Sequence, residues 1–375
     1  MTKHQGYILI GCVFICTTVL LTLYFASPLS QDLYRAEFDR RFVSGNSLIK
    51  EAEVDLETSD YYLAGLTSEK VYLARVTNPL ELAIVDIKDR TKKTVNLRFD
   101  DQENLLKAPG FKLKIDSPYY FITNGVLPVL FRGRLNEWTA KRFMPDSAYF
   151  VEAVPITSNS FALRSRHVTN NQFELAKESK SDKPNFSFKN GLLKKQVDGF
   201  FCVEGMLRYD KTTNNVLYLY TYRNQYMVLD TNMNLMHEHH TIDTFSHAMV
   251  KVANIESKGY STLAVPPAQI NINSWASGKN LFVQSNIMAN NEDQKTFERS
   301  STIDIYDFST GKYLRSFHIP DLHRVKIGDF QISERRLVAI FGQYLVTYEL
   351  NTEVIDHIQM SRIRTDKDEL SAKVE

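Results

Sequence analysis

The sequence repeats one pattern from end to end: an apolar strand runs into a polar turn, and the turn leads into a second short strand. The pattern occupies residues 82–97, 226–235 and 303–314, and a weaker copy lies at 344–353. Each copy places Asp, Asn or Thr-Gly where the chain must reverse, as in the turns that join antiparallel strands. The repeat therefore predicts a series of antiparallel hairpins and an all-β chain.

Strand alternation and frequent turn signals continue from residue 48 onwards, so the strands fall into units of four. We predict six units of about 50 residues each, and seven is the alternative because the third and fifth units are poorly marked. Such units are typical of a β-propeller, in which the recurring hairpin is the outer pair of strands of a blade. Ring closure removes free sheet edges, and the strand predicted at 48–56 is suited to pair with the last blade.

Some strand positions depend on weak signals. The first strand of the fourth blade is predicted at 199–209 and that of the fifth at 268–272. The outermost strand of the sixth blade is predicted at 353–359. The innermost strands predicted from these assignments carry no repeated His or carboxylate at matching positions, which a metal in the central channel would need.

The repeated units resemble the six-bladed propeller superfamily that includes TolB-like and NHL-repeat proteins, over about residues 48–360. The strand–Asp–turn–Thr-Gly-Lys–strand hairpin, best formed at Asp304 to Leu314, carries the resemblance. WD40 repeats fit poorly, because the chain has no Trp-Asp dipeptide and only 15 glycines. The resemblance implies the architecture and transfers no catalytic residue.

Residues 6–26 contain no charged side chain and are rich in Ile, Leu, Val and Phe, so they predict a transmembrane helix. Tyr7 and Tyr24 stand near the two ends, where aromatic rings favour the membrane interface. A cleaved signal peptide is the alternative, but small residues are missing from the positions that a cleavage site needs. The apolar spacing of residues 31–42 suggests a short helix beside the membrane.

These signals divide the chain into five parts, listed in order: a short tail at 1–5, the transmembrane helix at 6–26, a linker or helix at 27–47, the propeller at 48–360, and a disordered charged tail at 361–375. Lys and Arg at the two flanks of the helix do not decide its orientation. The usual layout of a signal anchor favours a single-pass protein of the bacterial cytoplasmic (inner) membrane, with the propeller outside the cytoplasm.

Charge and cysteine content exclude some classes of function. With 45 basic and 44 acidic residues, the chain lacks the basic footprint of a protein that binds nucleic acid. Of the three cysteines, Cys12 and Cys16 lie in the apolar segment. Cys202 stands alone in a predicted apolar strand and is expected to be a buried structural thiol.

His237 and His239 are the sharpest candidates for metal binding, because alternate residues of a strand share one face. Their segment is predicted to be an outermost strand, where polar residues also serve to discourage aggregation. We therefore predict no metal and no cofactor. A second set clusters around the fifth blade and suggests a polar mouth for a small ligand, or ordinary turn chemistry; its members are Gln269, Asn273, Trp275, Asn286 and Asn290.

Two functions remain in competition. The sequence contains no recognisable catalytic motif, so we favour a membrane-anchored, non-enzymatic binding or assembly module for a protein or envelope component. Its binding face is expected to include the long connections at 243–269 and 286–299, because long loops of compact folds are often functional. The alternative is a propeller enzyme, a hydrolase or lyase with its site at the central channel.

Overall fold

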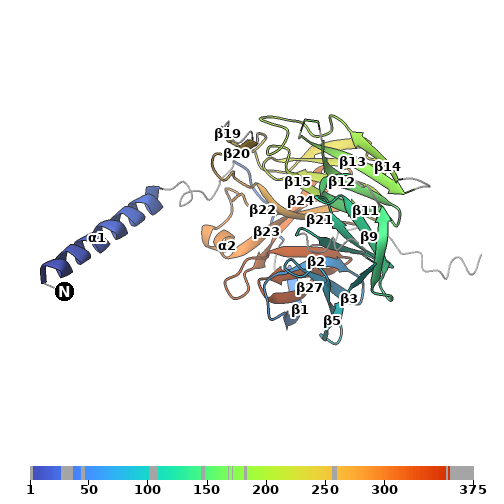
Figure 1. Cartoon of the computed structure of the whole chain (residues 1–375), viewed down its shortest axis with the longest axis horizontal. Coiled ribbons are helices and arrows are strands. Elements are labelled where there is room, and N and C mark those ends of the chain that lie inside the picture. Colours follow the sequence, from blue (N-terminus) through green and yellow to red (C-terminus); the bar gives the residue numbers. More distant parts are fainter. Residues whose placement is uncertain are drawn as a thin grey trace, which may run out of the picture.

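The chain folds into a six-bladed β-propeller with a separate N-terminal helix (Figure 1). This computed structural model describes residues 3–26, 37–43, 47–100, 109–144, 148–167, 169–170, 172–180, 184–255, 260–351 and 354. Each blade is an antiparallel sheet of four principal strands, so the predicted architecture and the number of six blades are confirmed.

Blades one to three follow the chain without interruption. Blade one contains β2 (Tyr61–Leu66), β3 (Lys70–Arg75), β4 (Glu81–Asp86) and β5 (Lys92–Asn96). Blade two contains β7 (Lys112–Asp116), β8 (Tyr119–Asn124), β9 (Val129–Arg134) and β10 (Thr139–Met144), and β6 (Arg98–Asp100) adds a parallel strand beside β10. Blade three contains β11 (Phe150–Thr157), β12 (Ser160–Arg166), β13 (Phe173–Lys180) and β14 (Pro184–Lys189).

Blades four and five are joined by a connection that carries a small hairpin. Blade four contains β15 (Gly205–Asp210), β16 (Asn215–Tyr220), β17 (Gln225–Leu229) and β18 (Leu235–His240). The hairpin consists of β19 (Val252–Ile255) and β20 (Tyr260–Leu263). Blade five contains β21 (Asn271–Ser277), β22 (Asn280–Ser285), β23 (Ser300–Asp307) and β24 (Lys312–Pro320), with the short helix α2 (Gln294–Glu298) between β22 and β23.

The N-terminal strand of the propeller completes the last blade. Blade six contains β25 (Asp329–Ser333), β26 (Arg336–Phe341), β27 (Tyr344–Leu350) and, as its outermost strand, β1 (Leu48–Asp55). The pairing of β1 with β27 is antiparallel, from Leu48 opposite Leu350 to Asp55 opposite Tyr344. The predicted pairing of 48–56 is thus confirmed. The outermost strand predicted at 353–359 is wrong, because β1 occupies that place; apart from Val354, that segment lies outside the described residues.

The antiparallel order gives the propeller two different faces. The turn face holds the tight turns between the first and second strands and between the third and fourth strands of the blades. The loop face holds the longer connections: those inside blades, such as 286–299, and those between blades, such as 241–270. Neighbouring blades contact each other mainly through their innermost strands, and these strands therefore surround the central channel.

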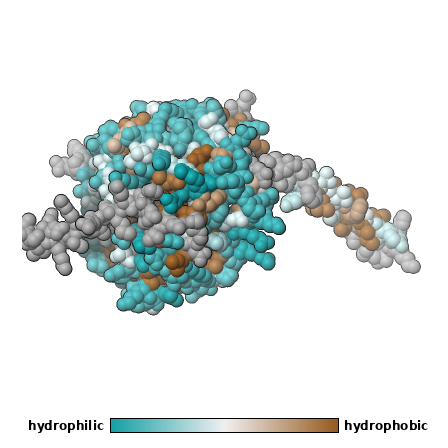
Figure 2. Space-filling view, turned by 180° about the vertical axis from the view of Figure 1, so that it is seen from behind, coloured by the Kyte–Doolittle hydropathy of each residue, from teal (hydrophilic) through white to brown (hydrophobic). Residues whose placement is uncertain are grey.

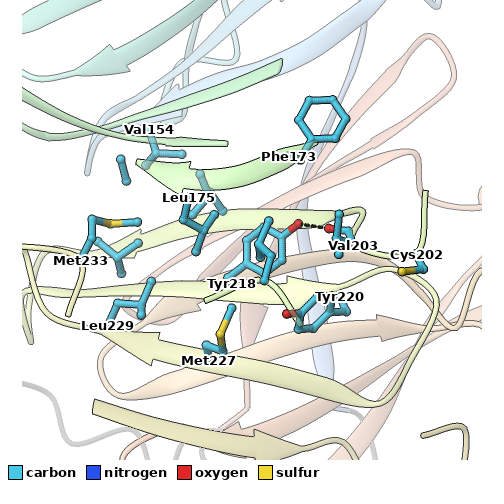
Figure 3. Close-up of a cluster of buried hydrophobic side chains, with 14 of the residues drawn as sticks. Val154, Phe173, Leu175, Cys202, Val203, Tyr218, Tyr220, Met227, Leu229 and Met233 are labelled. Carbon is cyan, nitrogen blue, oxygen red and sulfur yellow. Dashed lines mark hydrogen bonds between the residues drawn. The ribbon is translucent and has the colours of Figure 1, made fainter. Parts of the chain in front are cut away.

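The middle strands of the blades are apolar on both sides because a neighbouring blade covers each side. All six residues of β22 are buried, as are five of the six in β16. Figure 3 shows such a cluster between blades three and four, where Tyr218 donates a 2.5 Å hydrogen bond to the carbonyl of Val203. This burial explains the continuous apolar runs that interrupt the alternating pattern.

The recurring hairpin joins the third and fourth strands of blades one, four and five, as predicted. Its Asp caps the turn: Asp230 Oδ1 accepts from the amides of Asn232 and Asn234, each at 2.8 Å. Asp307 does the same for Ser309, and Gly311 supplies the positive φ of 75° that the end of this turn requires. The chemistry of one side chain thus explains why the motif recurs.

Two predicted first strands are misplaced. The residues before Gly205 form turns and not a strand, because Asp198 Oδ1 accepts from the amides of Phe200 and Phe201 and bends the chain. Cys202 is fully buried as expected, but it lies in this turn. In blade five, β21 begins at Asn271 and extends beyond the predicted range.

The helix α1 (Lys3–Ala26) is long and apolar enough to cross a membrane between Gln5 and Tyr24, by length and composition alone. Where its side chains are described they are mostly exposed, and the helix stands out from the largely hydrophilic propeller (Figure 2). The short helix predicted at 31–42 is wrong over its described part, because residues 37–42 form no helix and Phe42 pairs in parallel with Ser316. Residues 31–36 lie outside the described part.

Candidate functional site

A set of polar side chains from five of the six innermost strands lines the central channel. This channel cluster consists of Lys114 (β7), Glu152 (β11), Arg208 (β15), Asn273 (β21) and Asp329 (β25). Two members owe their position to β-bulges, because β11 shifts register between Phe150 and Glu152 and β21 shifts between Asn271 and Asn273. The cluster thus places four charged side chains and one amide on the innermost strands.

The members of the channel cluster are bonded to one another across blade boundaries. Arg208 Nη1 lies 3.3 Å from Glu152 Oε1, and its Nη2 donates to Asn273 Oδ1 at 2.9 Å. Asn273 Nδ2 donates in turn to Asp329 Oδ1 at 3.1 Å. The remaining carboxylate oxygens accept backbone amides, Glu152 from Leu207 and Asp329 from Leu63, each at 3.0 Å. These bonds tie together blades one, three, four, five and six.

Blade one contributes the backbone amide of Leu63 to this set, and Gly65 of the same strand packs closely on blade two. A Cβ added at Gly65 would lie 2.6 Å from Cβ of Ile115, so no side chain fits there. The strand β2 shifts register between Leu63 and Gly65, and at this shift the amide of Leu63 donates to Asp329.

Within the cluster, Glu152 and Arg208 form a close ion pair, whereas the amine of Lys114 is farther from a carboxylate. Burial disfavours the charged form of Glu152, but the charges of Lys114 and Arg208 overcome it and lower the pKa of the carboxyl group. Burial raises the pKa of Asp329. Burial also lowers the pKa of Lys114 to about 8, although Glu152 lies 4.0 Å from Nζ. Lys114 is therefore the member best suited to chemistry near neutral pH.

We expect Lys114 to react as a neutral amine from about pH 8 upwards. A lowered pKa means that the ammonium loses its proton at a lower pH than the ordinary lysine value of 10.5, and only the neutral amine is nucleophilic. Acetylation by a limiting amount of acetic anhydride, mapped by mass spectrometry between pH 6 and 11, should give a midpoint near 8 for this residue. Lys114→Met identifies the peptide, and a midpoint near 10.5 would contradict the assignment.

The five residues predicted to form a ligand mouth are distributed over three places. Asn273 belongs to the channel cluster, and Trp275 Nε1 donates to the carbonyl of Ile332 at 2.7 Å while its ring packs on the core of blade six. Asn286 Nδ2 donates to the carbonyl of Gln269 at 3.1 Å on the loop face. The amide of Asn290 donates to the carbonyl of Phe38. A ligand role for this set stays a prediction.

His237 and His239 lie on β18, as predicted, with ring centroids 5.5 Å apart. Burial and the neighbouring imidazole of His237 lower the pKa of His239. Across the residues that the structure describes, no three His, Cys, Asp or Glu side chains form a group that could hold a metal ion.

A second polar centre holds the described segment 37–43, which follows α1 in the sequence. Arg40 is buried on the loop face of blade five, where its Nε and Nη2 lie 2.8 and 3.0 Å from the two carboxylate oxygens of Asp304. Its Nη1 lies 2.6 Å from Glu292 Oε2. Burial alone would lower the pKa of Arg40, but the charges of Asp304 and Glu292 raise it, so the guanidinium stays charged. We call Arg40, Asp304 and Glu292 the linker clasp.

Neighbouring contacts extend the linker clasp. Asn291 exchanges two hydrogen bonds with the backbone of Arg40, at 2.9 and 2.8 Å. Phe42 stacks on His318 with centroids 4.4 Å apart, and His318 Nε2 lies 2.8 Å from Glu292 Oε1. In the connection 286–299, expected to form part of a binding face, residues 287–292 contact the linker, whereas most of 293–299 is exposed.

An open groove of about 460 Å³ lies on the turn face, where β1 meets blade one. Carboxylates and cationic groups both line it; the charged residues are Glu51, Glu69, Asp86, Lys88, Asp89, Arg90 and Arg336. Two of the arginines bind Glu51 of β1. Arg336 Nε lies 3.0 Å from Glu51 Oε2, and Arg90 Nη2 donates to the carbonyl of Glu51 at 2.8 Å. Glu69, Lys88 and Asp89 point from exposed turns.

The sequence did not single out Glu152, Arg208 or Arg40. Glu152 is a single charged residue in the otherwise apolar strand β11, and this signal could have pointed to the channel cluster. No pattern in the sequence marks Arg40, because its partners Glu292 and Asp304 come from the far end of the chain.

No family model matches this sequence, and no curated protein matches it. Among solved structures, the chain is similar to a member of the DUF4221 family from Bacteroides vulgatus, at 12% identity and TM-score 0.49, over 81% of this chain and 97% of that chain. It is also similar to a protein described as exported from Bacteroides fragilis, at 12% identity and TM-score 0.48, over 85% and 99%. A streptogramin B lyase has 10% identity and TM-score 0.46, over 80% and 97%. Identities this low say nothing about activity or ligands.

Proposed function

We propose that the protein is a non-enzymatic binding or assembly module, held at a membrane by α1 and presenting its turn face to a protein partner. The membrane is the bacterial cytoplasmic membrane, with the propeller outside the cytoplasm. The linker clasp is the observation that carries the proposal. It fixes the segment after the anchor to the loop face, so the opposite face, with its charged groove, stays open to the aqueous side.

The groove supports a protein partner more than a small apolar ligand. It is open and bordered by charges of both signs, whereas sites for small molecules are usually enclosed and largely apolar. Complementary charges give an interface its specificity and its association rate. A segment of a partner that carries both signs fits this surface.

Site-specific photo-crosslinking in cells tests the proposal. A photoreactive amino acid at Asp89, in the groove, should capture one defined protein, and Glu69→Lys should lower the yield. The matched control is Asn232, in the corresponding turn of blade four on the same face. Equal capture at both positions, or none at Asp89, would contradict the proposed binding site.

An enzymatic function, hydrolase or lyase, is the second candidate, and Lys114 is the observation that favours it. A lysine with a pKa near 8 is a suitable general base. The other charged members of the cluster already bond to one another, which supports a structural role for them. Loss of a measured hydrolase or lyase activity in Lys114→Met, with the crosslink at Asp89 unchanged, would favour the enzyme.

A further inference from the structure

Exposed apolar side chains are distributed unequally between the two faces of the propeller. On the loop face, the large exposed apolar residues of the connections are Val76, Val126, Tyr149, Val197, Phe200, Met249, Val265 and Val325. Among the described turns of the turn face no such residue occurs, and the exposed Leu235 and Met236 lie in the outermost strand β18, at its turn-face end. An apolar set gathered in the connections of one face marks a surface that meets another apolar phase or partner.

Four of these apolar residues belong to one joined group of loops. Val197 and Phe200, 54% and 37% exposed, come from the connection before β15, and Met249 and Val265, 44% and 40% exposed, come from the connection before β21. The side chain of Gln196 joins the two connections, because its Nε2 donates to the carbonyl of Ser246 and its Oε1 accepts from the amide of Ala248. We call Val197, Phe200, Met249 and Val265 the apolar rim.

The linker brings the anchor to the same group of loops. The ring of Phe38 packs on a small core of Ala268, Ile270 and Ile287, together with Phe245. Phe245, Ala268 and Ile270 belong to the connection that carries Met249 and Val265, and Ile287 belongs to the connection 286–299. In Figure 1, β19 and β20, which belong to this connection, lie on the same side of the propeller as α2.

The length of the chain limits how far the rim can lie from the anchor. Eleven residues lie between Ala26, at the end of α1, and Phe38. A fully extended chain gains at most about 3.5 Å per residue, so the distance between Ala26 and Phe38 is roughly 40 Å or less. The linker clasp holds Arg40, and with it the linker, on this face. The loop face beside blades four and five therefore stays within reach of the surface into which α1 inserts.

From these observations we infer that the apolar rim rests on the lipid surface of the membrane that holds α1, with its side chains among the headgroups. The inference rests on the proposed anchoring by α1. Lys195 and Lys251 are exposed beside the rim and suit anionic headgroups. Interfacial binding of this kind combines buried apolar area with attraction to anionic lipid. The contact would fix the orientation of the turn face away from the bilayer.

Depth-dependent fluorescence quenching tests the inference on the full chain. The protein, with Cys12→Ala and Cys16→Ala, is reconstituted in vesicles of phosphatidylcholine and phosphatidylglycerol, and an environment-sensitive dye is attached to Met249→Cys. Cys202 is buried and should not react. Lipids with a spin label near the headgroup should quench this dye several-fold more than a dye at Asp89→Cys on the turn face.

A third label separates failure of this inference from failure of the anchor. A dye on native Cys12, in a chain with Cys16→Ala, together with lipids that carry a spin label deep in the acyl chain, reports whether α1 lies in the bilayer. Quenching at Cys12 without quenching at Met249→Cys would overturn the inference and leave the proposed anchor intact, and a protein partner would then be the occupant of the rim. Absence of quenching at Cys12 would overturn both. Phe200→Asp should reduce quenching at Met249→Cys if lipid is the contact.

Discussion

Replacing Arg40 by Ala should lower the free energy of unfolding by about 3–5 kcal/mol, the usual cost of removing one partner from a buried ion pair. The substitution leaves Asp304 and Glu292 buried without their cation. Urea unfolding of the full chain in detergent, followed by the fluorescence of its two tryptophans, measures the effect. Arg40→Lys should recover only part of the loss, because an ammonium lacks the planar fork that contacts both oxygens of Asp304.

The neighbouring Arg41 provides a matched control. It is exposed, stacks on Tyr313 at 5.5 Å and donates to that residue's carbonyl at 3.0 Å. Arg41→Ala should therefore cost less than about 1 kcal/mol. Equal effects of the two substitutions would contradict the linker clasp as a buried, stabilising element.

Gly125→Ala should destabilise the propeller by about 3 kcal/mol or more, which is the upper part of the range for overpacking. Gly125 lies where blade two meets the first strand of blade three, and its carbonyl accepts from the amide of Phe150 at 3.2 Å. A Cβ at this position would lie 1.7 Å from the carbonyl oxygen of Phe150. Because the obstacle is backbone, a change of rotamer does not relieve the clash.

Gly328→Ala is the control for this substitution. It precedes β25, has no positive φ, and an added Cβ would meet no atom closer than the Ile340 carbonyl oxygen at 3.8 Å. Its effect on the free energy of unfolding should stay within about 0.5 kcal/mol. Thermal unfolding of both variants compares them, and a Gly125→Ala chain as stable as the control would contradict the tight contact between the blades.

The architecture was predictable because its signal is local. The Asp that caps each outer turn acts on amides two to four residues away, so the hairpins at Asp86, Asp230 and Asp307 are visible in the sequence. The same reasoning failed before β15, where apolar residues 199–204 imitate a strand. There Asp198 caps a turn, and burial of Cys202 and Val203 accounts for the apolar composition.

The candidate sites were less predictable because they depend on register and on distant contacts. The register shift in β11 gives Glu152 its pairing in the sheet, and no propensity fixes such a shift. In the linker clasp, Arg40 contacts Asp304, although almost the whole propeller sequence lies between these two residues. The segment 31–42 was mistaken for a helix because its aromatic residues are spaced as on a helix face. Phe38 and Phe42 instead pack on blade five from a chain that is not helical.

The place of β1 has a consequence for biosynthesis. The first strand of the propeller to leave the ribosome pairs with β27, which is made last, so it waits on the order of tens of seconds at ordinary rates of synthesis. During that time it is an unpaired strand in a growing chain that already contains α1. Its alternation of apolar residues with Lys50, Glu51, Glu53 and Asp55 suits this delay, since charges on a strand discourage pairing with wrong edges.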